Sequence, residues 1–186
     1  EKGQYEQAVQ VCQATLPRVD NRAALWLLLA EVHSLARRTD EARRTLDQAV
    51  SVLVGKEQLI AQLALVRHLL SHDERQGGID LLEHLTQKYP QDSRPLLHLL
   101  QLPEIQDEVQ AAQRMVDQLR AIEGDRGLQW PFAQAQLWLR GDDWRNRVPE
   151  ITNLLQRCMK ADPGWPSPVA VLGDMYEALE KDDQAE

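Results

Sequence analysis

A repeated spacing of small and apolar residues constrains the fold of this 186-residue chain more than any other feature. Two pairs of stripes recur after 34 positions: Ala8, Cys12 and Thr15 as Ala42, Leu46 and Ala49, and Gly78, Leu82 and Leu85 as Ala112, Val116 and Leu119. Within each stripe the residues are three and four positions apart, which places them on one face of a helix. A fixed interval of this length is typical of stacked helical pairs, because one pair cannot bury its apolar face alone. The sequence therefore predicts an all-α repeat fold.

Prolines and glycines between the stripes divide the chain into successive segments. We expect a single solenoid over 1–186, made of a half repeat at 1–20, repeats at 21–54 and 55–92, irregular repeats at 93–126 and 127–164, and a truncated repeat at 165–186. The first irregular repeat has a short helix between Pro95 and Pro103, because proline does not continue a helix. The second has a long loop from Arg140 to Pro149. Near the end of the chain, a polar break is expected at Lys181–Asp183.

This pattern resembles the tetratricopeptide repeat, a helix–turn–helix unit of 34 residues. The resemblance is carried by Trp26, Leu29, Ala30 and His33 with Ala42, Leu46 and Ala49, and by Leu172, Gly173 and Tyr176 with Ala185. It implies a right-handed α-solenoid of stacked helix–turn–helix repeats, with small residues where helices touch. The small residues expected at such contacts are Ala30, Ala42, Ala49, Gly78, Ala112 and Gly173.

Both ends of the chain fall inside a repeat, which predicts that the chain is a piece of a longer array. The first stripe, which starts at Ala8, belongs to the second helix of a pair whose first helix is not in the sequence. At the other end, Ala185 belongs to a second helix of which only the first residues are in the sequence. Natural arrays end in a repeat with a polar outer face. Since neither end has one, we expect the uncapped ends to allow dimerisation.

Charge and hydropathy exclude two classes of partner. The formal net charge is −8, whereas a protein that binds nucleic acid without sequence preference needs a basic surface. The most apolar run, from Ala23 to Ala30, is less than half of the ~20 residues that a membrane span requires. We therefore expect no nucleic-acid binding and no membrane insertion of this segment.

The sequence contains little that indicates catalysis. His68 and His72 are four positions apart, a spacing that can bind zinc on one helical face, but no HExxH motif or third ligand accompanies them. Cys12 and Cys158 are far apart and outside any CxxC pair, and no glycine-rich phosphate loop with Lys-Ser/Thr is present. We expect a non-catalytic protein without cofactor or metal, and a metal-binding enzyme fragment at His68 and His72 is the least favoured alternative.

The resemblance also implies where a partner binds, because the first helices of this family line a concave groove that holds peptides or partner helices. Carried over by position, the groove residues are Leu27, Glu31, Ser34, Leu63, Arg67, Leu70, His98, Phe132, Trp138 and Asp174. Trp138 is the expected anchor, because tryptophan is enriched at interface hot spots. The predicted function is a protein–protein interaction scaffold that binds a protein or peptide partner. The alternative is a structural spacer or assembly segment within a longer multi-repeat protein.

Overall fold

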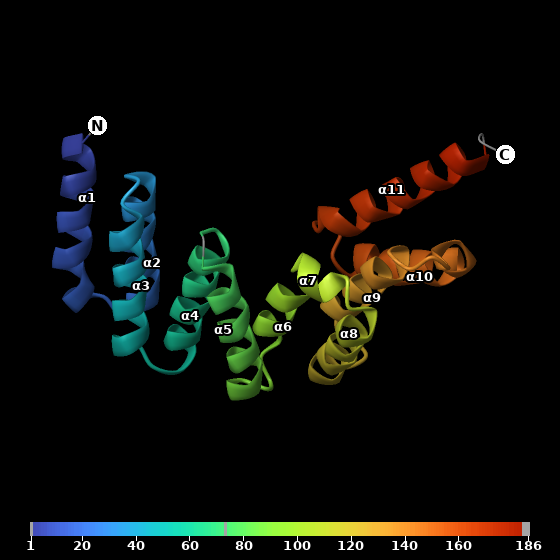
Figure 1. The fold of residues 1–186 in the computed structure, drawn as a ribbon, viewed down its shortest axis with the longest axis horizontal. Coiled ribbons are helices and arrows are strands. Elements are labelled where there is room, and N and C mark those ends of the chain that lie inside the picture. Colours follow the sequence, from blue (N-terminus) through green and yellow to red (C-terminus); the bar gives the residue numbers. More distant parts are fainter. Residues whose placement is uncertain (1, 73, 184–186) are drawn as a thin grey trace. The chain divides into compact units, whose positions relative to one another are not determined.

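The computed structural model describes residues 2–72 and 74–183, and every regular element in these ranges is a helix (Figure 1). The chain divides into two compact units, Glu1–Lys88 (unit 1) and Tyr89–Glu186 (unit 2). None of the helices in the described ranges is long and apolar enough to cross a membrane.

Unit 1 is built from consecutive helices that pack against their neighbours. Its elements are α1 (Lys2–Thr15), the 3-10 helix η1 (Leu16–Arg18), α2 (Arg22–Leu35), α3 (Thr39–Val52), α4 (Gly55–Leu70) and α5 (Arg75–Lys88). Besides the consecutive pairs, α2 also contacts α4 (Figure 1). Contact between the first helices of successive pairs is what a stacked repeat produces.

Small side chains lie at the closest helix contacts of unit 1, as the spacing predicts. Ala42 and Ala49 of α3 are completely buried, and Ala30 of α2 is almost so. Gly78 of α5 is also buried, and a methyl group added there would lie 2.9 Å from Cδ2 of Leu70. These contacts allow the helices to approach at close range, and larger neighbours such as Trp26 fill the space beside them.

Unit 2 contains a helical pair with a short first helix, followed by a pair with an irregular connection. Its elements are α6 (Ser93–Leu100), α7 (Pro103–Gln106), α8 (Val109–Glu123), α9 (Gln129–Leu139), the 3-10 helix η2 (Trp144–Arg147), α10 (Val148–Ala161) and α11 (Pro166–Asp183). The short helix before Pro103 has the eight residues of α6, and it includes Pro95 in its first turn, where a missing N–H is tolerated. Helices α9 and α10 pack against each other, and both contact α11 (Figure 1).

The start of α9 is fixed by side chains from the preceding segment. Glu123 Oε2 accepts hydrogen bonds from the backbone N–H groups of Gln129 and Trp130, each at 3.1 Å. The indole Nε1 of Trp130 donates to the carbonyl of Gly124 at 3.0 Å, and the guanidinium groups of Arg120 and Arg157 lie 4.7 and 5.0 Å from the centre of its ring system. A carboxylate at the positive end of α9 is favourable, because it satisfies N–H groups that have no partner within the helix.

Three expectations from the sequence are corrected by the structure. Gly173 is exposed, and a methyl group there would have no atom within 4 Å, so it is not a site of close helix contact. The segment expected to be a loop from Arg140 to Pro149 contains η2, whereas Pro149 lies in the first turn of α10, where proline is accommodated as expected. The polar break expected at Lys181–Asp183 is absent, since α11 continues to Asp183, and Ala185 lies outside the described residues.

Candidate functional site: a pocket between successive first helices

Unit 1 has a pocket of about 250 Å³ between α2 and α4, which we call pocket 1. It is lined by Leu27, Ala30, Glu31, Ser34, Leu46, Ala64, Arg67, His68, Ser71 and His72. Three of these residues, Ala30, Leu46 and Ala64, belong to one buried apolar cluster and form its apolar floor. The small side chains of Ala30 and Ala64 leave the space open, whereas larger residues at these positions would fill it.

The two walls of pocket 1 carry opposite charges. Glu31 of α2 and Arg67 of α4 are both exposed, and neither forms an ion pair with a described residue. The two serine hydroxyls are used within their own helices: Ser34 Oγ donates to the carbonyl of Ala30 at 3.1 Å, and Ser71 Oγ donates to the carbonyl of Arg67 at 2.8 Å. Glu31 and Arg67 are therefore the charged groups of the pocket that are open to a ligand.

A pair of histidines completes the α4 side of pocket 1. The rings of His68 and His72 are stacked, with their centres 4.4 Å apart and their planes inclined by 28°. His72 Nδ1 lies 2.7 Å from the carbonyl oxygen of His68. Because a carbonyl oxygen only accepts, Nδ1 carries the proton, and Nε2 of the neutral ring is a hydrogen-bond acceptor.

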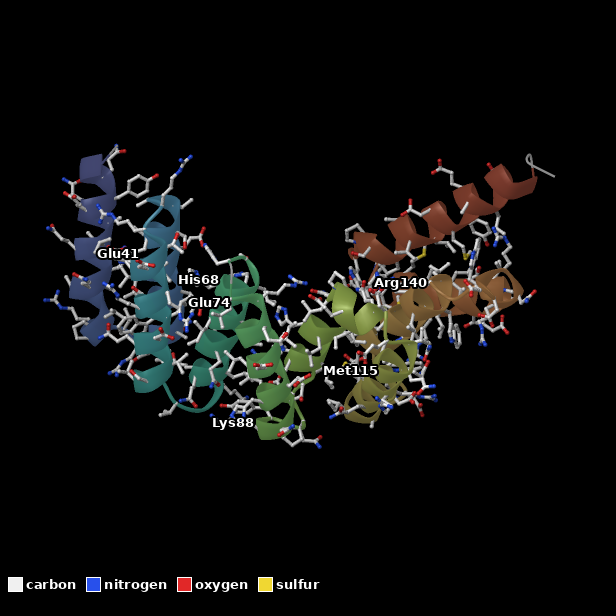
Figure 2. The ribbon with its side chains drawn as sticks, viewed as in Figure 1. Glu41, His68, Glu74, Lys88, Met115 and Arg140 are labelled. Carbon is white, nitrogen blue, oxygen red and sulfur yellow. The ribbon has the colours of Figure 1, made fainter. Side chains whose placement is uncertain are left out.

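The pKa of His68 is lowered, first by burial and then by electrostatic interaction with His72 and Arg43, while Glu74 and Asp47 oppose the shift. Arg43 of α3 is itself held by these two carboxylates. Its Nη1 lies 2.8 Å from both Glu74 carboxylate oxygens, and its Nε lies 3.0 Å from Asp47 Oδ2. These bonds tie α3 to the turn after α4, close to His68 (Figure 2). They fix the part of the wall that carries the histidines.

Unit 2 has a pocket of about 270 Å³ between α9 and α11, which we call pocket 2. It is lined by Gln136, Leu139, Arg140, Trp144, Val171, Asp174, Met175 and Ala178. Most of this lining is apolar, and Met175 belongs to a buried cluster of the unit. Arg140 (Figure 2) and Asp174 are exposed residues on its two walls, with no ion pair to a described residue. In pocket 1 the acid Glu31 comes from α2, whereas in pocket 2 the base Arg140 comes from the C-cap of α9.

The structure brings half of the predicted groove residues to these pockets. Leu27, Glu31, Ser34 and Arg67 meet in pocket 1, and Asp174 lines pocket 2. The remaining five, Leu63, Leu70, His98, Phe132 and Trp138, line neither pocket.

The five residues outside the pockets are half-buried, and packing explains the position of three of them. Leu70 lies against Gly78 of α5. The ring of Phe132 is tilted against that of Trp165, with the centres 4.8 Å apart. Trp138 packs on the buried cluster of unit 2, and the guanidinium of Arg147 lies 5.2 Å from its ring centre.

The residues that the sequence did not predict differ in how detectable they were. Ala64, His68 and Ser71 have helical spacing and line pocket 1 together with the predicted Arg67. Each of the three lies one position after a predicted residue, Leu63, Arg67 or Leu70. Arg140 precedes Asp174 by the repeat interval of 34 positions, so the period could have identified it. Trp144 lies in the irregular connection, where no period applies.

The histidine pair has too few companions to define a metal centre. In the part of the chain that the structure describes, no group of three or more His, Cys, Asp or Glu side chains could hold a metal ion. Buried Cys158 donates to the carbonyl of Leu128 at 3.4 Å, and burial raises the pKa of its thiol, which disfavours the reactive thiolate.

Stacked helical pairs with pockets between successive first helices define the chain as an α-helical repeat protein. Residues 1–63 match the family model described as tetratricopeptide repeat. The fold is similar to that of a chain in the crystal structure of the APC/C hetero-tetramer Cut9–Hcn1, with a TM-score of 0.66 and 14% sequence identity. That match covers 98% of this chain and 35% of the other, so the chain spans about a third of the length of the protein it matches.

Residues 1–63 thus match the tetratricopeptide repeat, and the predicted all-α solenoid class of the chain is confirmed. No curated protein matches it. Members of this repeat family generally bind other proteins, which supports a general role as an interaction scaffold.

Proposed function

We propose that the chain is a non-catalytic scaffold that binds a peptide or a partner helix on the face formed by α2 and α4. The observation that carries this proposal is pocket 1, where an apolar floor lies between Glu31 and Arg67. Such a site can bury one side chain of a partner while charges at its edge set the register of the bound segment. Leu28 and Leu35 of α2 are also exposed, although they do not line the pocket.

Pocket 2 supports the same function in unit 2, but its lining is mostly apolar. Its floor of Leu139, Val171 and Met175 suits an apolar side chain, and Arg140 and Asp174 supply charges at the edge. Most of the binding energy of a peptide comes from a few apolar anchors in such pockets, and the surrounding charges mainly fix orientation. We propose pocket 2 as a second anchoring site.

The test is selection of random dodecapeptides displayed on phage, with the purified chain immobilised. A filled-pocket variant, Ser34→Trp, places a large ring at an exposed position that lines pocket 1. The matched control, Gln48→Trp, places the same ring at an exposed position of α3 outside either pocket. Circular dichroism melting establishes that both variants are folded.

We expect the wild type and Gln48→Trp to retain the same family of peptides, and Ser34→Trp to lose it. Retention by all three proteins would place the peptide site elsewhere and would contradict the assignment to pocket 1. Retention by none would refute peptide binding and favour the alternative of a structural spacer.

A further inference from the structure

We propose that pocket 1 recognises a partner segment that carries one basic and one acidic side chain, the basic one beside Glu31 and the acidic one beside Arg67. This inference rests on the proposed function and specifies the chemistry of the partner. The partner is a peptide segment of mixed charge, because Glu31 and Arg67, which line the pocket, are opposite in sign and lie on different helices.

The polar groups of pocket 1 leave these two charges as the recognition elements. Both serine hydroxyls and Nδ1 of His72 already donate to backbone carbonyls of α4 or α2. Arg43, the other arginine near the histidines, already bonds to Asp47 and Glu74 through Nε and Nη1. Glu31 and Arg67 have no partner among the described residues, although they line the same concavity.

Because Glu31 and Arg67 lie on separate helices, they can fix the direction in which a segment binds to pocket 1. The acid comes from α2 and the base from α4, so a bound segment is aligned with its basic residue toward α2 and its acidic residue toward α4. An exposed ion pair contributes little affinity, but the wrong charge at either wall is repelled. The two charges therefore select the order of charges in the partner more than they tighten its binding.

The histidine pair should make recognition of the acidic residue dependent on pH. His68 faces Arg43 and Asp47 from α3, Glu74 and His72 from the turn after α4, and the pocket lined by Glu31 and Arg67. A carboxylate bound beside Arg67 favours the protonated imidazole, whereas the free pocket disfavours it. Binding then takes up a proton, and by linkage affinity for an acidic segment rises as the pH falls from about 7.5 to about 6.

The test compares the dodecapeptides selected by the wild type, Glu31→Gln, Arg67→Gln and the control Arg44→Gln. Arg44 is an exposed arginine of α3 that does not line either pocket. We expect Glu31→Gln to lose the enrichment of Lys and Arg while keeping that of Asp and Glu. Arg67→Gln should show the converse, and the control should retain both.

The best wild-type peptide is then synthesised and titrated by fluorescence polarisation. Each pocket variant should weaken its binding about two- to fivefold, and binding to the wild type should strengthen between pH 7.5 and pH 6. The pH effect should be smaller in His68→Gln/His72→Gln.

Failure of the proposed function and failure of the mixed-charge inference would give different results. If the wild type retains no peptide, the proposed function fails. If it retains peptides through pocket 1 without enrichment of charged residues, the proposed function stands and the mixed-charge inference is overturned. Sedimentation that reveals a dimer lost in Arg67→Gln would also overturn the inference, because a second copy of the chain would then occupy the pocket.

Discussion

Two adjacent glycines of α5 show how local packing decides the effect of one methyl group. A methyl at Gly78 would lie 2.9 Å from Cδ2 of Leu70 and 3.3 Å from Cβ of Leu69, whereas a methyl at Gly77 has no atom within 4 Å. We expect Gly77→Ala to raise the free energy of unfolding by about 0.5–1 kcal/mol, because alanine is the better helix former. Gly78→Ala should be about 1–3 kcal/mol less stable than Gly77→Ala because of overpacking. Urea denaturation measures both, and equal stabilisation would contradict the close contact of α4 and α5.

The buried residue His33 should make stability depend on pH. Its Nδ1 has no hydrogen-bond partner in the described structure. Burial lowers the pKa of His33, while Glu41 raises it and Arg38 lowers it. Around the ordinary histidine pKa of about 6.5, the folded state therefore binds fewer protons than the unfolded state. The stabilisation is fully present above this pH, and it is lost as the pH falls through it toward the lower folded-state pKa.

The measurement is the free energy of unfolding of the wild type and of His33→Leu at pH 7.5 and pH 5.5. We expect the wild type to lose more stability on acidification than the variant, because leucine does not titrate. The pKa of His68 is also lowered and this residue is present in both proteins, so its contribution cancels in the comparison. An equal loss would show that His33 is protonated in the folded state without cost.

At the scale of helices, the connection between α8 and α9 depends on Glu123, which accepts two backbone hydrogen bonds at the start of α9. Glu123→Ala should lower the free energy of unfolding by about 1–2 kcal/mol, the effect of removing a helix cap. The control is Gln118→Ala, at an exposed position of the same helix. Hydrogen exchange should also accelerate at the first amides of α9 in the glutamate variant. Unchanged exchange there would mean that Arg120 and Arg157 hold Trp130 without the carboxylate.

The helices themselves were predictable where the repeat is regular. The stripes ending at Leu85 and Leu119 are buried as expected, because a second helix must present small and apolar residues to its neighbours on both sides. Prediction failed where the chain departs from the period. The segment from Arg140 to Pro149 contains a 3-10 helix whose tryptophan lines pocket 2, and no spacing rule applies to it.

The predicted groove residues Leu63 and Leu70 each lie one position before a residue of pocket 1, and helical geometry explains why they do not line it. With 3.6 residues per turn, an error of one residue turns the expected face by about 100°. The prediction of Leu63 and Leu70 therefore missed the pocket, whereas Arg67 lies within the face defined by Ala64, His68 and Ser71. Trp138 was expected at the groove because of its residue type, but a large ring on α9 also fills space beside α10 and η2. Residue type alone does not distinguish these two roles.

At the scale of the whole molecule, the chain has two compact units with separate apolar clusters. In a repeat protein each pair contacts only its neighbours, so stability is distributed along the chain. We expect Gly78→Ala to accelerate hydrogen exchange in α4 and α5 more than in α9 and α10. Mass spectrometry of exchanged peptides measures this difference. Uniform acceleration over both units would indicate that the chain unfolds as one cooperative body.

The central claim is that a partner binds on the face of α2 and α4 at pocket 1. The most direct measurement is an NMR titration of the isotopically labelled chain with the best peptide selected on the wild type. We expect the largest amide shift changes at Leu27–Ser34 and at Ala64–His72, with small changes on the outer faces of α3 and α5. Shift changes concentrated on those outer faces, with pocket 1 unaffected, would contradict the account.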